Sequence, residues 1–117
     1  MSKETVDNTK NIVISVGLDA KNVPVHMEWQ ADASSSKEPV ECKAMLLSLF
    51  DKEHRDTLKI DLWTNEMQVA EMDRFFYQTL RGLADTYFNA TKNHKLANEM
   101  RHFVEYFGEQ TEVLPKK

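Results

Sequence analysis

The 117-residue chain has few of the residues that mark special folds: one cysteine, three glycines and three prolines. A single cysteine, Cys42, excludes an internal disulfide, so stability has to come from a hydrophobic core. Three scattered glycines leave no glycine-rich loop to hold a nucleotide phosphate. No apolar run approaches the roughly 18 residues that a membrane-spanning helix needs. These absences give no sign of a disulfide-stabilised, nucleotide-binding or membrane-spanning protein.

The charge is too small and too evenly spread to indicate a polyanionic partner. Fifteen basic and nineteen acidic residues give a net charge of −4. Nucleic acids and anionic membranes bind basic surfaces. The first residues, MSKETVDNTKN, are polar and lack the apolar centre of a signal peptide. We therefore expect a cytoplasmic protein with no nucleic-acid partner and no direct membrane insertion.

Hydrophobic residues at every second position predict β-strands in the first half of the chain. The pattern covers residues 11–19, 22–32 and 57–63. Pro24, at the start of the second strand, favours a position at an edge of the sheet. The run 40–50 is apolar at nearly every position, and we interpret it as a strand that forms a hairpin with 57–63. Its helix-favouring residues leave a helix open as the alternative.

Apolar residues at steps of three and four predict two amphipathic helices in the second half. Asn65 and Gln68 form a capping-box pattern before the first helix, and Asn93 is the expected N-cap of the second. Gly108 is suited to the end of the second helix. The apolar stripes are Val69, Met72, Phe76, Leu80, Leu83 and Tyr87 in the first helix, and Leu96, Met100, Phe103, Val104 and Phe107 in the second.

Strands followed by helices are typical of the α+β class. We predict a four-stranded antiparallel sheet followed by two C-terminal helices packed on one face. Residues 1–10 are expected to form a flexible N-terminal arm, residues 11–110 a single domain and residues 111–117 a polar tail. The covered face of the sheet is predicted to carry Ile12, Ile14, Val16, Val25, Met27, Trp29, Leu58, Ile60 and Leu62.

The run 40–50 is apolar on both sides, so helices on one face would leave apolar side chains on the other. Each large apolar side chain left exposed forgoes roughly 1.5–3 kcal/mol of burial, and clusters of them usually mark a contact surface. The arm, the tail or the hairpin folding over them is one alternative. Self-association or binding of a protein partner is the other. The predicted interaction surface consists of Met45, Leu47, Leu49, Trp63 and Val13.

No residue pattern indicates catalysis, a metal site or a cofactor. The four histidines fall on a strand, a hairpin tip and the second helix, without the spacing of a ligand set. Glu99 and His102 match half of a di-iron helix motif, but the second half and its carboxylates are absent. No serine lies in a nucleophile elbow. We therefore predict a protein that is not an enzyme and that has no catalytic residues, metal or cofactor.

Two long stretches of the chain resemble a known family. They read ECKAMLLSLFDKEHRDTLKIDLWTNEMQVAEMDRFFYQTL and LADTYFNATKNHKLANEMRHFVEYFGE. Both are similar to the GldC family of gliding-motility proteins of the Bacteroidetes, and the likeness extends over about residues 11–110. The resemblance implies a small cytoplasmic accessory protein of the gliding machinery, without enzymatic activity. It implies a protein partner in that machinery and brings no catalytic residues.

The order of the predicted strands and helices resembles that of a second group of proteins. Four antiparallel strands followed by two helices, with an acidic surface, are similar to SecB-type export chaperones. This likeness rests on fold order alone, without a shared motif. It implies, as the alternative function, a chaperone that binds unfolded chains.

Overall fold

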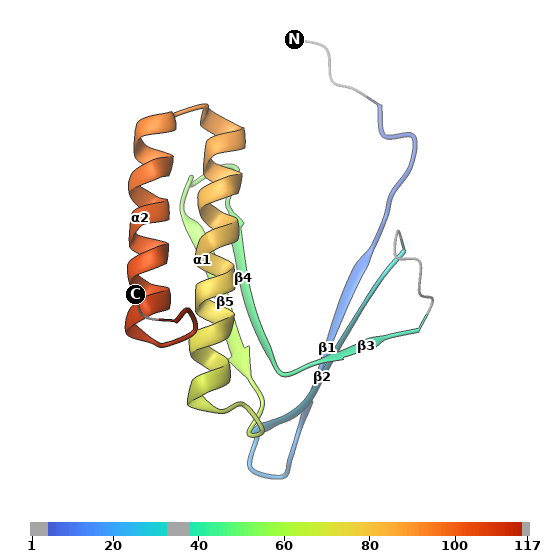
Figure 1. Cartoon of the computed structure of the whole chain (residues 1–117). Coiled ribbons are helices and arrows are strands. Elements are labelled where there is room, and N and C mark those ends of the chain that lie inside the picture. Colours follow the sequence, from blue (N-terminus) through green and yellow to red (C-terminus); the bar gives the residue numbers. More distant parts are fainter. Residues whose placement is uncertain (1–4, 33–37, 116–117) are drawn as a thin grey trace. The chain divides into compact units, whose positions relative to one another are not determined.

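The computed structural model describes residues 5–32 and 38–115. The chain divides into two compact units, Met1–Met67 with the five strands and Gln68–Lys117 with the two helices (Figure 1). This order confirms the α+β class. The packing of the helices on one face of the sheet stays a prediction. The division into an arm, a single domain and a tail also stays a prediction.

In residues 5–32 and 38–115, five strands form two sheets, so the prediction of one four-stranded sheet is wrong. The first sheet has the antiparallel order β1-β2-β3 and the second is an antiparallel β4–β5 ribbon. The strand bounds are Ile12–Leu18 for β1, Pro24–Ala31 for β2, Val40–Cys42 for β3, Ala44–Phe50 for β4 and Thr57–Trp63 for β5.

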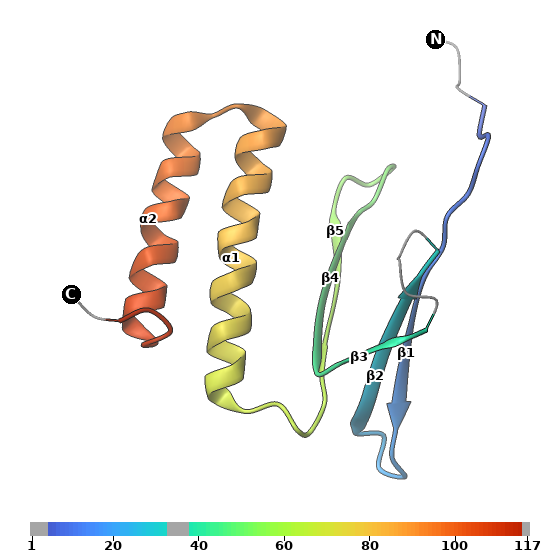
Figure 2. The same cartoon turned by 45° about the vertical axis from the view of Figure 1, so that its right-hand side comes forward.

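The sheets separate because the run 40–50 pairs with two different strands. It is extended as predicted, and the helix alternative is wrong, but Lys43 interrupts it between β3 and β4. Cys42 lies opposite Met27, and β2 begins at Pro24, so little of β2 is left to pair beyond Cys42. β5 pairs with the rest of the run instead. β3 and β4 therefore meet at the bend seen in Figure 2.

Pro24 does not mark an edge strand, because β2 is the central strand of its sheet. Pro24 is the first residue of β2, beside a register shift between Gly17 and Leu18. A missing N–H is tolerated at such a position. The carbonyl of Pro24 accepts a hydrogen bond from the Asn65 N–H at 3.1 Å, which joins the start of β2 to the chain that leaves β5.

The second unit is a hairpin of two helices, α1 (Val69–Thr91) and α2 (His94–Gln110). The predicted cap at Asn65 is wrong: Gln68 is the N-cap, and it forms a capping box with Glu71. Asn65 instead belongs to the turn after β5, where its N–H is bonded to Pro24. The predicted cap of the second helix is confirmed, since the Asn93 side chain accepts a hydrogen bond from the Leu96 N–H at 3.1 Å.

Small residues dominate the buried positions of this hairpin, and most of the predicted apolar stripes lie elsewhere. The buried residues are Ala84 in α1 and Ala97, Val104 and Gly108 in α2. Small side chains allow helix axes to approach closely. On the 3.6-residue helical period, most of each stripe lies about a quarter turn away from these positions. Five stripe residues are exposed: Val69, Phe76, Leu83, Leu96 and Phe103.

Gly108 gives the chain after α2 room to fold back. The helix continues past Gly108 to Gln110, and Glu112 then adopts a positive φ of 63°. The Leu114 N–H donates a hydrogen bond to the Gly108 carbonyl at 2.9 Å. A Cβ at Gly108 would lie 2.7 Å from both Leu114 Cδ1 and Tyr77 Cε1. Glycine is thus required by this close contact, and part of the predicted polar tail packs on the hairpin.

Replacement of Gly108 by alanine is expected to destabilise the protein by about 1 kcal/mol. Overpacking of a tight site typically lowers the free energy of unfolding by about 1–3 kcal/mol. The higher helix propensity of alanine offsets about 1 kcal/mol of this loss. Urea unfolding of the full chain, followed by circular dichroism, measures the difference.

The matched control is Gly82→Ala in α1, where no atom lies within 4 Å of the added Cβ. This variant is expected to gain about 0.5–1 kcal/mol. Equal stabilities of the two alanine variants would contradict the close contact at Gly108.

Candidate interaction surface

The β4–β5 ribbon gathers the apolar residues of both strands on one side. Opposed residues of an antiparallel pair project to the same face. We call the resulting surface the ribbon's apolar face. It contains three opposed pairs: Met45 with Leu62, Leu47 with Ile60 and Leu49 with Leu58. The ribbon therefore has one side made wholly of large apolar side chains.

This register corrects the predicted assignment of faces. Met45, Leu47 and Leu49 were expected on the opposite side from Leu58, Ile60 and Leu62, but each is paired with one of them. Alternation along each strand shows which residues share a side within that strand. It does not show which sides of two strands coincide, because that depends on their register.

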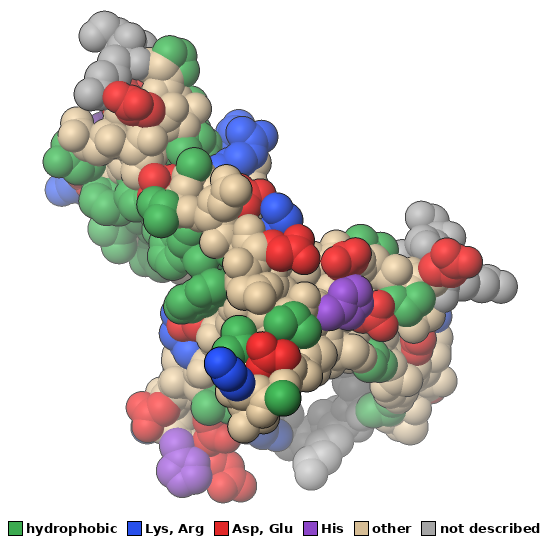
Figure 3. Space-filling view, turned by 90° about the horizontal axis from the view of Figure 1, so that it is seen from below, with side chains coloured by type: hydrophobic (Ala, Val, Ile, Leu, Met, Phe, Trp, Pro, Cys, Tyr) green, Lys and Arg blue, Asp and Glu red, His purple; other side chains and the backbone are tan. Residues whose placement is uncertain are grey.

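Half of the ribbon's apolar face is exposed. Leu49 is 51% exposed, Leu58 59% and Ile60 40%. A two-stranded ribbon is marginally stable by itself and needs packing against its apolar side. Several exposed apolar side chains on one face are typical of a contact surface. Hydrophobic side chains also gather on the surface of the helical unit (Figure 3).

The other two residues of the predicted surface lie elsewhere. Trp63 is opposite Ala44, on the reverse side of the ribbon, and is 54% exposed. Val13 is opposite Gln30 in the three-stranded sheet. The structure thus brings together Met45, Leu47 and Leu49, and separates Trp63 and Val13 from them. Trp63 instead lines a cavity of about 440 Å³ with Val23, Pro24, Asp61, Leu62 and Asn65.

The three-stranded sheet has one apolar and one mostly polar side. Val16 and Cys42 flank Met27 on the apolar side, and Met27 is fully buried. Cys42 is half-buried. Burial raises the pKa of its thiol, and the charge of Glu41 raises it further. The thiol is therefore protonated near neutral pH, which is typical of a structural cysteine.

A histidine and two carboxylates cluster on the polar side of this sheet. Glu28 lies directly opposite Glu41, which places like charges side by side. His26 Nε2 is 3.2 Å from Glu28 Oε2, and its Nδ1 is 3.5 Å from Glu41 Oε1. The hydrogen bond to Glu28, followed by the charges of both carboxylates, raises the pKa of His26. A protonated His26 thus offsets the repulsion between the two glutamates.

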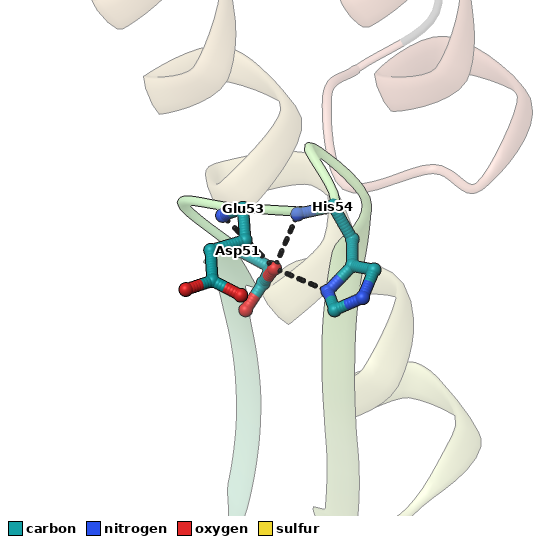
Figure 4. A network of polar contacts seen from close by, with 3 residues as sticks. All are labelled: Asp51, Glu53 and His54. Atoms are coloured by element: carbon teal, nitrogen blue, oxygen red, sulfur yellow. Dashed lines mark hydrogen bonds and ion pairs between the residues drawn. The ribbon is translucent and has the colours of Figure 1, made fainter.

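The acidic tip of the ribbon is a structured turn. The Asp51 carboxylate accepts hydrogen bonds from the Glu53 and His54 N–H groups and from His54 Nδ1 at 2.9 Å (Figure 4). These bonds, led by the one from the His54 backbone, lower the pKa of Asp51. Since the carboxylate stabilises the turn that joins β4 to β5, we assign Asp51 a structural role.

The helical hairpin carries a groove of about 480 Å³, lined by Tyr77, Val104, Leu114 and four charged residues. Arg101 on its rim pairs with Asp85 at 3.2 Å and lies over the Phe88 ring at 5.5 Å. The other charged residues of the groove are Arg81 and Glu105. Two positive and two negative side chains leave no net charge to select an ionic ligand.

No group of three or more metal-ligating side chains occurs in the part of the chain that the structure describes. Within residues 5–32 and 38–115, neither helix is long and apolar enough to cross a membrane.

Comparison with known proteins identifies one family. A family model described as "Gliding motility-associated protein GldC-like" matches residues 24–113. The match spans both units, from the start of β2 to the chain after α2. No curated protein and no solved structure matches the chain.

The His26 cluster predicts that part of the protein's stability is lost as the pH rises. A folded-state pKa above 6.5 means that the stabilising contribution is complete below pH 6.5. It disappears as the pH passes through the raised value. An NMR titration of the His26 ring protons is expected to give a pKa above 6.5.

Two variants test the cause of this shift. Glu28→Gln is expected to return the pKa of His26 toward 6.5, and Glu41→Gln to lower it less, because the bond to Glu28 is the largest contribution. A His26 pKa at or below 6.5 in the unmodified protein would rule out the cluster as described.

Proposed function

Because this chain belongs to the GldC-like family of gliding motility-associated proteins, we propose that it acts in gliding as a non-enzymatic accessory protein. In this proposal it binds a protein component of the gliding machinery and holds it through an apolar contact. The family match supplies the biological setting. The exposed apolar side of the β4–β5 ribbon supplies the physical basis for binding.

The ribbon's apolar face is the observation that carries this proposal. It combines exposed leucine and isoleucine side chains on one side of a two-stranded backbone, an arrangement that is suited to an apolar helix or strand of a partner. Complete burial of a large apolar side chain contributes roughly 1.5–3 kcal/mol, and Leu49, Leu58 and Ile60 are already partly buried. After the cost of association is subtracted, the contact is suited to a weak, reversible complex.

Leu49 is the residue best placed to test the contact. It is 51% exposed, lies opposite Leu58 and is near the tip of the ribbon. In the native cell, the Leu49→Asp variant is expected to lose gliding and to lose at least tenfold in affinity for the partner, since a buried carboxylate opposes apolar association. Gliding speed and affinity capture with mass spectrometry are the two measurements.

Trp63→Asp is the matched control. Trp63 is 54% exposed, similar to Leu49, but lies on the reverse side of the same ribbon. This variant is expected to glide and to bind the partner normally. Both variants are first compared by thermal unfolding, so that a loss of fold is not mistaken for a loss of contact. Normal gliding of a stably folded Leu49→Asp protein would eliminate the proposed surface.

A chaperone for unfolded chains is the second candidate, and the exposed stripe of the helical hairpin favours it. Val69 is 81% exposed, and Leu83 and Phe103 are also exposed. An extended apolar surface of this type binds unfolded chains without strict sequence preference. The chaperone function predicts that the protein suppresses aggregation of an unrelated unfolded protein at stoichiometric amounts. Unchanged light scattering in that assay would eliminate this candidate.

A further inference from the structure

Within the described residues, the outer edge of β5 pairs with no other strand along Thr57–Trp63, and just beyond it the Asn65 N–H donates a hydrogen bond to the Pro24 carbonyl. Among the residues that the structure describes, β5 pairs with β4 alone. Every residue of β5 except Leu62 is exposed. An exposed edge strand presents a row of free N–H and C=O groups, which is a template for pairing with another strand.

The ladder to β4 shows which backbone groups face this edge. The Thr64 N–H donates to the Lys43 carbonyl, and the Asp51 N–H donates to the Asp56 carbonyl, each at 2.8 Å. Because such bonds occur at every second residue of an antiparallel pair, the even-numbered residues of β5 face β4. The N–H and C=O groups of the odd-numbered residues therefore point outward, and these are Thr57, Lys59, Asp61 and Trp63.

We propose that β5 of one copy pairs with β5 of a second copy, antiparallel and about a twofold axis at Ile60. The strand reads TLKIDLW, and it is self-complementary in this register. Lys59 then lies opposite Asp61 of the second copy, and Asp61 lies opposite Lys59 of the second copy. Leu58 lies opposite Leu62 of the second copy. A twofold interface of this kind repeats each contact twice.

Charge selects this register over its neighbours. Moving the axis by one residue to Lys59 places two lysines opposite each other, and moving it to Asp61 places two aspartates opposite each other. Like charges directly opposite destabilise an antiparallel pair, and opposite charges stabilise it. Only the axis at Ile60 pairs each lysine with an aspartate.

The hydrogen-bonding pattern of the backbone fits the same register. Lys59 and Asp61 both point their N–H and C=O groups outward, so the opposed pair exchanges two hydrogen bonds. Ile60 and its counterpart form a non-hydrogen-bonded pair, in which side chains approach more closely. The product is a four-stranded sheet, β4-β5-β5-β4, whose apolar face joins those of two ribbons. A sheet of this size overcomes the weakness of an isolated ribbon.

The oligomeric state of the full chain is the first test. Sedimentation equilibrium from micromolar to several hundred micromolar is expected to show a reversible dimer. A protein that stays monomeric over this range overturns the proposal.

Charge reversal tests the register. The Lys59→Asp variant places like charges opposite each other in the dimer, and so does Asp61→Lys. Each is expected to dimerise at least roughly tenfold more weakly. An equimolar mixture of the two single variants is expected to form a heterodimer, because each lysine then again meets an aspartate. The double variant Lys59→Asp, Asp61→Lys is expected to form a homodimer.

Recovery in the mixture separates the interface from local effects. Lys59 and Asp61 also pair within one strand at 3.2 Å, and each single variant loses that pair. Mixing cannot restore a contact within one chain. Undiminished dimers of either single variant, or a mixture that stays monomeric, would overturn the proposed register.

A disulfide test locates the axis. In a Cys42→Ser background, Ile60→Cys places two thiols at a non-hydrogen-bonded pair with Cα atoms about 4.5 Å apart, within disulfide range. Rapid cross-linking on mild oxidation is expected. Leu58→Cys is the control, since the two copies of this residue lie four positions out of register. Equal cross-linking of both variants would contradict an axis at Ile60.

This inference concerns the edge of β5, whereas the proposed function depends on the ribbon's apolar face. The Leu49→Asp variant leaves the Lys59 and Asp61 contacts intact and is expected to dimerise. Failure of dimerisation and failure of partner binding are therefore observed separately.

Discussion

The first unit depends on the way residues 40–50 share their backbone hydrogen bonds between two strands. The beginning of the run completes the sheet of β1 and β2, and the remainder pairs with β5. Lys43 stands between the two ladders. Because β2 begins at Pro24, it is too short to accompany the whole run. This mismatch in length creates a bend and converts one expected sheet into two.

The bend has consequences for recognition. A four-stranded sheet would have given β4 a partner on each side. The ribbon instead has two strands, an apolar face and an open edge on β5. The face and the edge are suited to different contacts, because a face is covered by side chains and an edge pairs through backbone groups. Leu49 and Leu58 belong to the ribbon's apolar face, and Lys59 and Asp61 belong to the edge of β5.

In the helical unit, too, the close contacts differ from those expected from the sequence. Its close contacts involve residues with little side-chain volume, such as Ala84, Ala97 and Gly108, and most of the larger apolar residues lie to one side. In the sequence those larger residues give the strongest periodic pattern, and they were expected to form the core. Size explains the difference, since two helices approach most closely where side chains are short. The larger apolar side chains therefore lie outside the closest contact of α1 and α2.

The sequence by itself determined much of the local structure: β1, β2 and β5 from their alternation, both helices from their period, and the cap at Asn93 from its amide side chain. It also indicated that the apolar residues of 40–50 exceed what one covered face requires. Only the tertiary structure decided how the strands combine. Register placed Met45, Leu47 and Leu49 with the leucines of β5 and removed Trp63 and Val13 from them. Alternation and period are properties of neighbouring residues, whereas register and strand length matching arise between segments that are distant in the chain.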